Sequence, residues 1–429
     1  MMKAYQQHLN HLQKVTEKAL ATTHHDGLWI YSGHPENHFL DDHAPAYKMN
    51  PHFNWWIPET DISHSLLYIV PGKKPTLYLS QPADFWHKVN DYSKADWANA
   101  FDVHIIHNQS EMPSFENLFE HAWIGPDCWQ PLAKKQTNPK ALIDYLHFQR
   151  VQKTDYEINC IREANQRALK GHQAAANAFY DGASEYEINM AYLMACQSTQ
   201  NQMPYGNIVG LNENAAVLHY QYQSIQRHDK NNLRTFLIDA GYNYRGYAAD
   251  ITRTYAFDKN STFQAMIDVM DEKQWQLCEQ SIAGQDYIEL HKLTHLKIAE
   301  VLQQFKVIKC SPEAAVESGL SSTFFPHGLG HYLGLQVHDV AGHQTDAQGT
   351  PKAPPKEHPF LRLTDVLRKN AVITIEPGLY FIPMLLQQID RHKDVNWEVI
   401  KEFLPFGGIR IEDNVVVADG HSLNLTRGQ

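Results

Sequence analysis

The spacing of hydrophobic and polar residues divides the chain into an N-terminal region, residues 1–150, and a C-terminal region, residues 151–429. In the first region, apolar positions over residues 5–20 recur at the period of an α-helix. Alternating or apolar runs that are typical of strands follow at residues 27–31, 65–70, 76–80, 102–106 and 122–125. This pattern predicts a small mixed α/β domain.

Helix signals become dense in the C-terminal region. The capping-box spacing, in which Ser or Thr precedes Glu by three residues, occurs at Thr154 and at Ser184. Helices are predicted over residues 154–180, 184–199, 262–282 and 285–305. Short strands are predicted over residues 234–239, 247–256, 334–338, 371–376 and 409–417. Helices interleaved with strands predict one large α/β domain. The loop-like segment 342–359 is long enough to suggest a functional rim or lid.

Composition and charge exclude several kinds of partner. The 429 residues carry a formal net charge of −11, which disfavours binding to nucleic acid or to an anionic membrane. The N-terminus lacks the apolar core of a signal peptide, and no stretch approaches the roughly 20 apolar residues of a membrane span. The cysteines are odd in number and widely spaced, which favours a reduced, soluble, cytoplasmic protein. They are Cys128, Cys160, Cys196, Cys278 and Cys310.

Candidate chemistry lies in five acidic or histidine residues on apolar, strand-like segments: Asp239, Asp250, His331, Glu376 and Glu412. Such side chains point into a region from which water is largely excluded, where a bare carboxylate is costly to bury. The four carboxylates repel one another, but two divalent cations would balance their charge, and the imidazole adds a neutral ligand. The set predicts a dinuclear site. Carboxylate-rich ligands favour Mn²⁺, with Co²⁺ or Zn²⁺ as alternatives.

Taken singly, each of these positions has an ordinary structural interpretation. An Asp at a strand end is usually a turn former, and a histidine among glycines is often a loop residue. His327 and His331 also form an HxxxH pair, but Gly328 and Gly330 disfavour the helix that would place both on one face. The five positions together, in this order, are much harder to explain in this way.

The segments around these residues resemble the metal-binding motifs of the pita-bread hydrolases, which include methionine aminopeptidase, aminopeptidase P, creatinase and prolidase. The chain resembles bacterial prolidases in particular, including the prolidases that are similar to organophosphorus acid anhydrolases. The segments that carry this resemblance are residues 50–53, 55–56, 214–220 (NAAVLHY), 331–340 (HYLGLQVHDV) and 405–414 (PFGGIRIEDN). The resemblance spans nearly the whole chain. It implies a pita-bread catalytic domain over residues 151–429, preceded by a domain over residues 1–150 that covers the pocket and forms a homodimer.

The resemblance implies two metal positions that share Asp250 and Glu412 as bridging ligands. Asp239 completes one position, and His331 and Glu376 complete the other. A hydroxide that bridges the metals would attack the peptide carbonyl, while Glu376 takes the water proton and passes it to the leaving imino nitrogen. The implied reaction is hydrolysis of Xaa-Pro dipeptides at the bond before the C-terminal proline. The same hydroxide can attack phosphorus, so weak organophosphate triester hydrolysis is also expected.

Further residues match positions that contact substrate in prolidases. His219 and His338 would donate to the oxyanion of the tetrahedral intermediate. His327 would support a metal ligand or handle protons, although a histidine that merely follows Pro326 in a tight loop explains it equally simply. Arg362 would bind the C-terminal carboxylate of a dipeptide bidentately, which would limit substrate length. Arg410 lies two residues before the last metal ligand, on the same side of its strand, and would orient that ligand.

The N-terminal region carries no metal signal. Asp41, Asp42 and Trp86 lie in loop-like segments and are candidate contributors to a partner's pocket, although a solvated turn or a packed aromatic explains each one equally simply. Two other functions stay open: an Xaa-Pro aminopeptidase that acts on longer peptides, and a non-catalytic pita-bread binding protein. The second is disfavoured because all five ligands are present.

Overall fold

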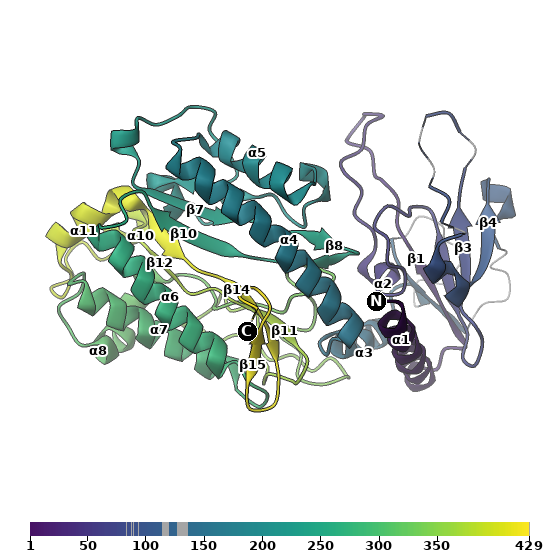
Figure 1. Cartoon of the computed structure of the whole chain (residues 1–429). Coiled ribbons are helices and arrows are strands. Elements are labelled where there is room, and N and C mark those ends of the chain that lie inside the picture. The colour runs from purple at the N-terminus through teal and green to yellow at the C-terminus, as the bar shows by residue number, and fades with distance from the viewer. Residues whose placement is uncertain are drawn as a thin grey trace. The chain divides into compact units, whose positions relative to one another are not determined.

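The computed structural model describes residues 1–82, 84–86, 88, 90–92, 94–113, 120–126 and 136–428. The chain separates into two compact units (Figure 1). Unit 1 comprises Met1–Arg150, Thr154–Asn159 and Asp346–Thr350, and unit 2 comprises Val151–Lys153, Cys160–Thr345 and Pro351–Gln429. Cys128 lies outside the described residues, and the other four cysteines are free thiols. No helix in the described part of the chain is long and apolar enough to cross a membrane.

A five-stranded sheet with the order β4-β3-β2-β1-β5 forms the centre of unit 1. Its strands are β1 (Gly27–Tyr31), β2 (Leu66–Ile69), β3 (Thr76–Ser80), β4 (Asp102–Ile106) and β5 (His121–Ile124). β1–β2 and β2–β3 pair antiparallel, whereas β1–β5 and β3–β4 pair parallel. The helices are α1 (Met2–Thr23), α2 (Pro51–Asn54) and α3 (Lys140–Arg150). The strands predicted for this region are confirmed, and α1 is longer than the predicted helix.

Eight helices lie wholly or mainly in unit 2, counted over its described residues: α4 (Asp155–Tyr180), α5 (Glu185–Cys196), α6 (Thr262–Gln280), α7 (Tyr287–Gln304), α8 (Pro312–Glu317), α9 (Leu320–Phe324), α10 (Pro383–Gln387) and α11 (Trp397–Phe403). Both predicted capping boxes form. The Thr154 backbone N–H donates to the Glu157 carboxylate at 2.8 Å, and Ser184 N–H donates to Glu187 at 2.8 Å. α5 ends earlier than predicted because Gln197 takes a left-handed conformation, with φ of 54°.

Short strands in the described part of unit 2 form four small sheets, ordered β10-β7-β6, β11-β14-β15, β12-β13 and β8-β9. The strands are β6 (Ile208–Leu211), β7 (Thr235–Asp239), β8 (Asn243–Tyr244), β9 (Tyr247–Ala248), β10 (Thr252–Ala256), β11 (Val372–Ile375), β12 (Gly378–Tyr380), β13 (Gly408–Arg410), β14 (Asp413–Val417) and β15 (Ser422–Asn424). Apolar residues of α4 and α5 pack on β6 and β7, and residues of α6 and α7 pack on β11 to β14 (Figure 1).

Three predicted strands differ from the structure. The run 247–256 is broken between β9 and β10, and the run 409–417 is broken between β13 and β14. The two breaks lie side by side, since Glu412 N–H donates to the Thr252 carbonyl at 3.0 Å. The predicted strand at 334–338 is wrong. Residues 334–338 form bends, because Gly334 N–H donates to the Gln336 carbonyl at 3.1 Å and folds the chain back on itself.

Candidate metal centre

The structure brings the five predicted ligands together at strand ends and strand breaks in unit 2. Asp239 is the last residue of β7, and Glu376 directly follows β11. Asp250 and Glu412 occupy the two adjacent breaks, where the backbone no longer continues a ladder and the side chains turn inward. Ligand atoms of Asp250, His331 and Glu412, all three buried, lie within 4.8 Å of one another.

His331 reaches this place from a loop that is fixed against β11. Thr374 N–H donates to the His331 carbonyl at 2.9 Å, and His331 N–H donates to the Thr374 hydroxyl at 3.1 Å. A Cβ at Gly330 would clash with the Thr374 carbonyl, so glycine is needed for this approach. The His331 Nδ1–H donates to the Tyr332 carbonyl at 2.9 Å. This bond directs Nε2 toward Asp250 Oδ2, 3.5 Å away, and Glu376 Oε1, 3.7 Å away, as in an imidazole that binds a metal.

The carboxylates strongly perturb one another. Burial, with the charges of Asp250 and Glu376, raises the pKa of Glu412 well above its usual range. Burial also raises the pKa of Glu376 to about 7 and that of Asp239 to about 6. Burial opposes ionisation of Asp250 as well, but the hydrogen bond from His331 lowers its pKa below the usual value. The chain's own cations therefore do not balance this group, and an oxygen-rich set with one imidazole fits divalent metal ions.

Arg410 is the buried cation nearest to these acids. Its Nη2 donates to Asp239 Oδ2 at 2.8 Å, and Nη1 donates to the Tyr380 hydroxyl at 3.0 Å. Its Nε donates to the Thr252 hydroxyl at 3.2 Å, and that hydroxyl donates to Glu412 Oε2 at 2.7 Å. Arg410 thus contacts one acid directly and reaches Glu412 only through Thr252.

His327 lies beside Glu376 and the phenol of Tyr380. Its Nε2 is 2.8 Å from the Tyr380 hydroxyl, and its Nδ1 is 3.9 Å from Glu376 Oε2. Burial, then the charge of Arg410, lowers the pKa of His327 to about 3. The imidazole is therefore neutral at physiological pH; its Nδ1–H donates to the Gly328 carbonyl at 2.8 Å, so its Nε2 accepts from the Tyr380 hydroxyl.

The predicted substrate residues are more exposed than the acids. The ring of His338 contacts that of His331 edge to face, with centroids 4.4 Å apart. Burial, then the charges of His331 and Arg362, lowers the pKa of His338 to about 4. His219 and Arg362 are exposed, and both lie close enough to act electrostatically on His338. Asp41, Asp42 and Trp86 are exposed residues of unit 1, with Trp86 78% exposed.

Two tyrosines and a threonine at this centre were not predicted from the sequence. The Tyr205 hydroxyl lies 2.8 Å from Asp239 Oδ1 and 2.5 Å from Asp250 Oδ1, so its single proton serves both acids. Tyr380 links Arg410 to His327, and Thr252 links Arg410 to Glu412. Thr252 and Tyr380 are near predicted ligands in sequence, but Tyr205 stands in a loop without any local pattern.

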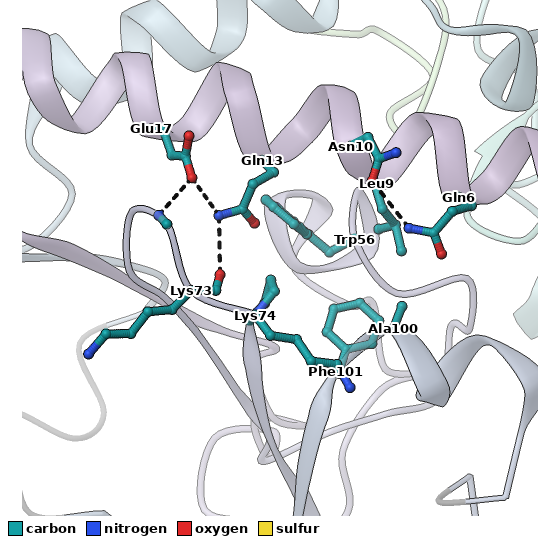
Figure 2. Close-up of a pocket in the computed structure, with 12 residues that line it drawn as sticks. Gln6, Leu9, Asn10, Gln13, Glu17, Trp56, Lys73, Lys74, Ala100 and Phe101 are labelled. Carbon is teal, nitrogen blue, oxygen red and sulfur yellow. Dashed lines mark hydrogen bonds between the residues drawn. The ribbon is translucent and has the colours of Figure 1, made fainter.

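A separate pocket of about 380 Å³ lies in unit 1 (Figure 2). Figure 2 shows Glu17, the one carboxylate among the described lining residues, accepting hydrogen bonds from Gln13 and from the Gly72 backbone N–H, at 2.9 Å each. Its other walls include Trp56, Phe101 and two lysines. The described residues that line the pocket include none of the predicted site residues and no set of metal ligands or proton-transfer groups.

Comparisons with known proteins identify the family of the chain. A family model for metallopeptidase family M24 matches residues 159–419, and one for the N-terminal domain of Xaa-Pro dipeptidase matches residues 3–148. The Xaa-Pro dipeptidase of Shewanella frigidimarina is 46% identical over 430 residues, which is 99% of this chain and 97% of that protein. The Xaa-Pro dipeptidase of Pseudoalteromonas translucida is 42% identical over 430 residues, with the same coverage.

Among solved structures, proline aminopeptidase P II from Yersinia pestis has a TM-score of 0.71 at 20% identity, covering 99% of this chain and 96% of that one. Zn-substituted aminopeptidase P of E. coli in complex with product has a TM-score of 0.69 at 20% identity, covering 96% and 94%. These similarities confirm the predicted pita-bread fold. With most of its length matched by the family model, the chain belongs to metallopeptidase family M24.

Proposed function

We propose that this chain is a metal-dependent Xaa-Pro dipeptidase that hydrolyses the bond before a C-terminal proline. The observation that carries the proposal is the convergence of Asp239, Asp250, His331, Glu376 and Glu412 in a largely buried place whose negative charge the protein does not itself balance. Full-length similarity to proteins named Xaa-Pro dipeptidase supports the substrate class.

We propose two Mn²⁺ ions as the natural metals, because carboxylate-rich ligation suits a hard cation. Asp250 and Glu412 would be shared between the two positions, Asp239 would complete the first, and His331 and Glu376 the second. When bound, the two cations supply the Lewis acidity that activates water and polarises the scissile carbonyl. The hydrogen bonds that Tyr205 and Thr252 donate to this set, and the one that His331 donates to the Tyr332 carbonyl, would hold the ligands in place.

The chain's own side chains would move the protons. Glu376 is the least buried of the five ligands, with its side chain 18% exposed, and can therefore face both the water and the leaving imino nitrogen. It would accept the water proton and deliver it to that nitrogen. His338 and His219 would donate to the oxygen of the tetrahedral intermediate. His327, neutral and bonded to Tyr380, would relay a proton beside Glu376.

Arg362 would bind the C-terminal carboxylate of the substrate. Its guanidinium is exposed and acts on His338, so it lies on the side where the substrate histidines are found. A fork of parallel donors suits a carboxylate. A dipeptide places its carboxylate one residue after the scissile bond, whereas a longer peptide places an uncharged amide there. Arg362 would thus make the enzyme selective for dipeptides.

We further propose a division into domains at residues 1–150 and 151–429, a homodimer, and a cytoplasmic location. Exposed apolar side chains in unit 1 support self-association: Phe39, Leu40, Phe85 and Trp86 are 78–92% exposed. Asp41, Asp42 and Trp86 would then be candidates to complete a partner's pocket. Light scattering of purified protein tests the dimer, and a mass of one chain would refute it.

Substrate length separates this function from that of an aminopeptidase. Metal-loaded protein should release proline from Gly-Pro but leave Gly-Pro-Gly uncut. The opposite profile would identify an aminopeptidase that acts on longer peptides. Binding of divalent metal without turnover of either peptide would instead indicate a non-catalytic protein.

A further inference from the structure

Three histidines gather in unit 2 outside the carboxylate centre. His291 and His295 lie one turn apart on α7 and therefore share a face of the helix. His358 comes from the segment that follows residue 351. The three ring centroids are 4.5, 4.6 and 4.7 Å apart in pairs, and one ligand nitrogen from each ring lies within 4.8 Å of the other two. We call these residues the three-histidine cluster.

The spacing within the cluster also suits a metal ion. Nε2 of His291 and Nε2 of His295 are 3.3 Å apart, a distance at which one donates a hydrogen bond to the other. Metal–nitrogen bonds of about 2.0–2.1 Å at a tetrahedral angle separate two nitrogens by about 3.3 Å. His358 is only partly buried, so rotation of its ring can bring the third nitrogen to the same distance.

One Nε2 of the His291–His295 pair donates to the other, and moving that proton to the unpartnered Nδ1 of His291 would free both Nε2 lone pairs for a metal. His295 Nδ1 is 3.0 Å from the Ser321 hydroxyl, a bond that directs Nε2 into the cluster, as outer partners do for histidines that bind metals. His291 is 1% exposed, and its Nδ1 has no hydrogen-bond partner among the described residues. Burial lowers the pKa of His291 to about 2 and that of His295 to about 3, so both rings are neutral. Neutral imidazole is the form that binds metals.

We propose that His291, His295 and His358 bind one divalent transition-metal ion, Zn²⁺ by preference, at a site distinct from the carboxylate centre. Three neutral nitrogens with no carboxylate favour Zn²⁺ over the harder Mn²⁺. Because His358 is partly exposed, solvent can supply a fourth ligand. The ion joins the segment that carries Arg362, four residues after His358, to helix α7.

Metal content measured on matched variants tests this site without relying on catalysis. Chelator-treated protein is saturated with Zn²⁺, passed through a desalting column and analysed for metal per chain. His358→Gln, which removes the partly exposed ligand and leaves the helix intact, should bind one equivalent less than the wild type. His343→Gln, in the same segment but outside the cluster, should bind as much as the wild type. Equal zinc content in His358→Gln and the wild type would overturn the proposal.

A second variant separates this site from the carboxylate centre. Glu412→Gln should lose metal from that centre, yet adding His358→Gln to it should remove one more equivalent of Zn²⁺. Co²⁺ in the Glu412→Gln protein should give the visible absorption of a tetrahedral nitrogen-rich site, and this absorption should disappear in the double variant. No further loss of metal and no such absorption would refute the three-histidine site, whatever the protein hydrolyses.

Discussion

Glu376→Gln should stabilise the metal-free protein and destabilise the metal-loaded protein. Burial, opposed in part by the charges of His331 and Arg410, raises the pKa of Glu376 from 4.5 to about 7 in the folded chain. In the unfolded chain the carboxyl ionises near its usual pKa. A tenfold change in proton affinity is worth about 1.4 kcal/mol, so this rise corresponds to about 3 kcal/mol. Glutamine has a similar shape and no proton to lose in this range.

The sign follows from proton binding. Between pH 4.5 and about 7 the folded metal-free protein holds a proton that the unfolded chain has released, so the free energy of unfolding falls as pH rises. This loss of stability of the metal-free wild type is complete above pH 7. The variant should therefore match the wild type near pH 4.5 and exceed it by about 3 kcal/mol at pH 8. With saturating Mn²⁺ the order should reverse, because the ion binds the folded wild type more tightly than the variant.

Urea unfolding at pH 5 and pH 8, with chelator and then with Mn²⁺, measures both effects. Glu402→Gln, an exposed residue of α11, is the control and should shift the unfolding midpoint little under any condition. A metal-free Glu376→Gln protein that is less stable than the wild type at pH 8 would refute the electrostatic reasoning. So would a difference that does not change with pH.

Three further predictions concern binding, stability and side activity. Arg362→Met should raise the KM for Gly-Pro by roughly 10- to 100-fold and change kcat less, because a hydrogen bond to a charged group is worth about 1.5–3 kcal/mol. An unchanged KM in steady-state kinetics would argue against carboxylate binding by Arg362. Lys153→Met should destabilise the protein by about 3–5 kcal/mol in urea unfolding, because it leaves the buried Asp339 without its 2.8 Å ion pair to Lys153. Lys401→Met, which removes the exposed ion pair to Glu398, is the control and should cost less than about 1 kcal/mol. Metal-loaded protein should hydrolyse an aryl phosphotriester slowly, as followed by release of the phenol, and no release above the rate of chelated protein would exclude this activity.

Local signals in the sequence predicted much of the fold. A capping box specifies a helix start through residues three apart, and the starts at Thr154 and Ser184 were placed correctly. The strand predicted at 334–338 was wrong because alternation of apolar residues does not distinguish a strand from a run of bends. The bends depend on Gly334 and on the distant contact between its carbonyl and Ala248.

The five candidate ligands could be selected from the sequence because each is a charged or imidazole group in an apolar setting. Their geometry could not be predicted, since it depends on the breaks at Asp250 and Glu412, which pair segments 160 residues apart in sequence, as the bond from Thr252 to Glu412 shows. Tyr205 and His358 had no local signal, although His291 and His295 stand four residues apart within a predicted helix. The roles of a loop tyrosine and of the partly exposed His358 can be recognised only in the folded structure, where elements distant in sequence lie together.

The most direct test of the central claim is proline release from Gly-Pro by metal-stripped protein as Mn²⁺ is added. If the five ligands hold catalytic cations, the stripped protein is inactive, turnover rises with Mn²⁺ to a plateau, and Glu412→Gln stays inactive at the same concentrations. Full activity in the stripped protein, or none when it is loaded with Mn²⁺, Co²⁺ or Zn²⁺, would contradict the account.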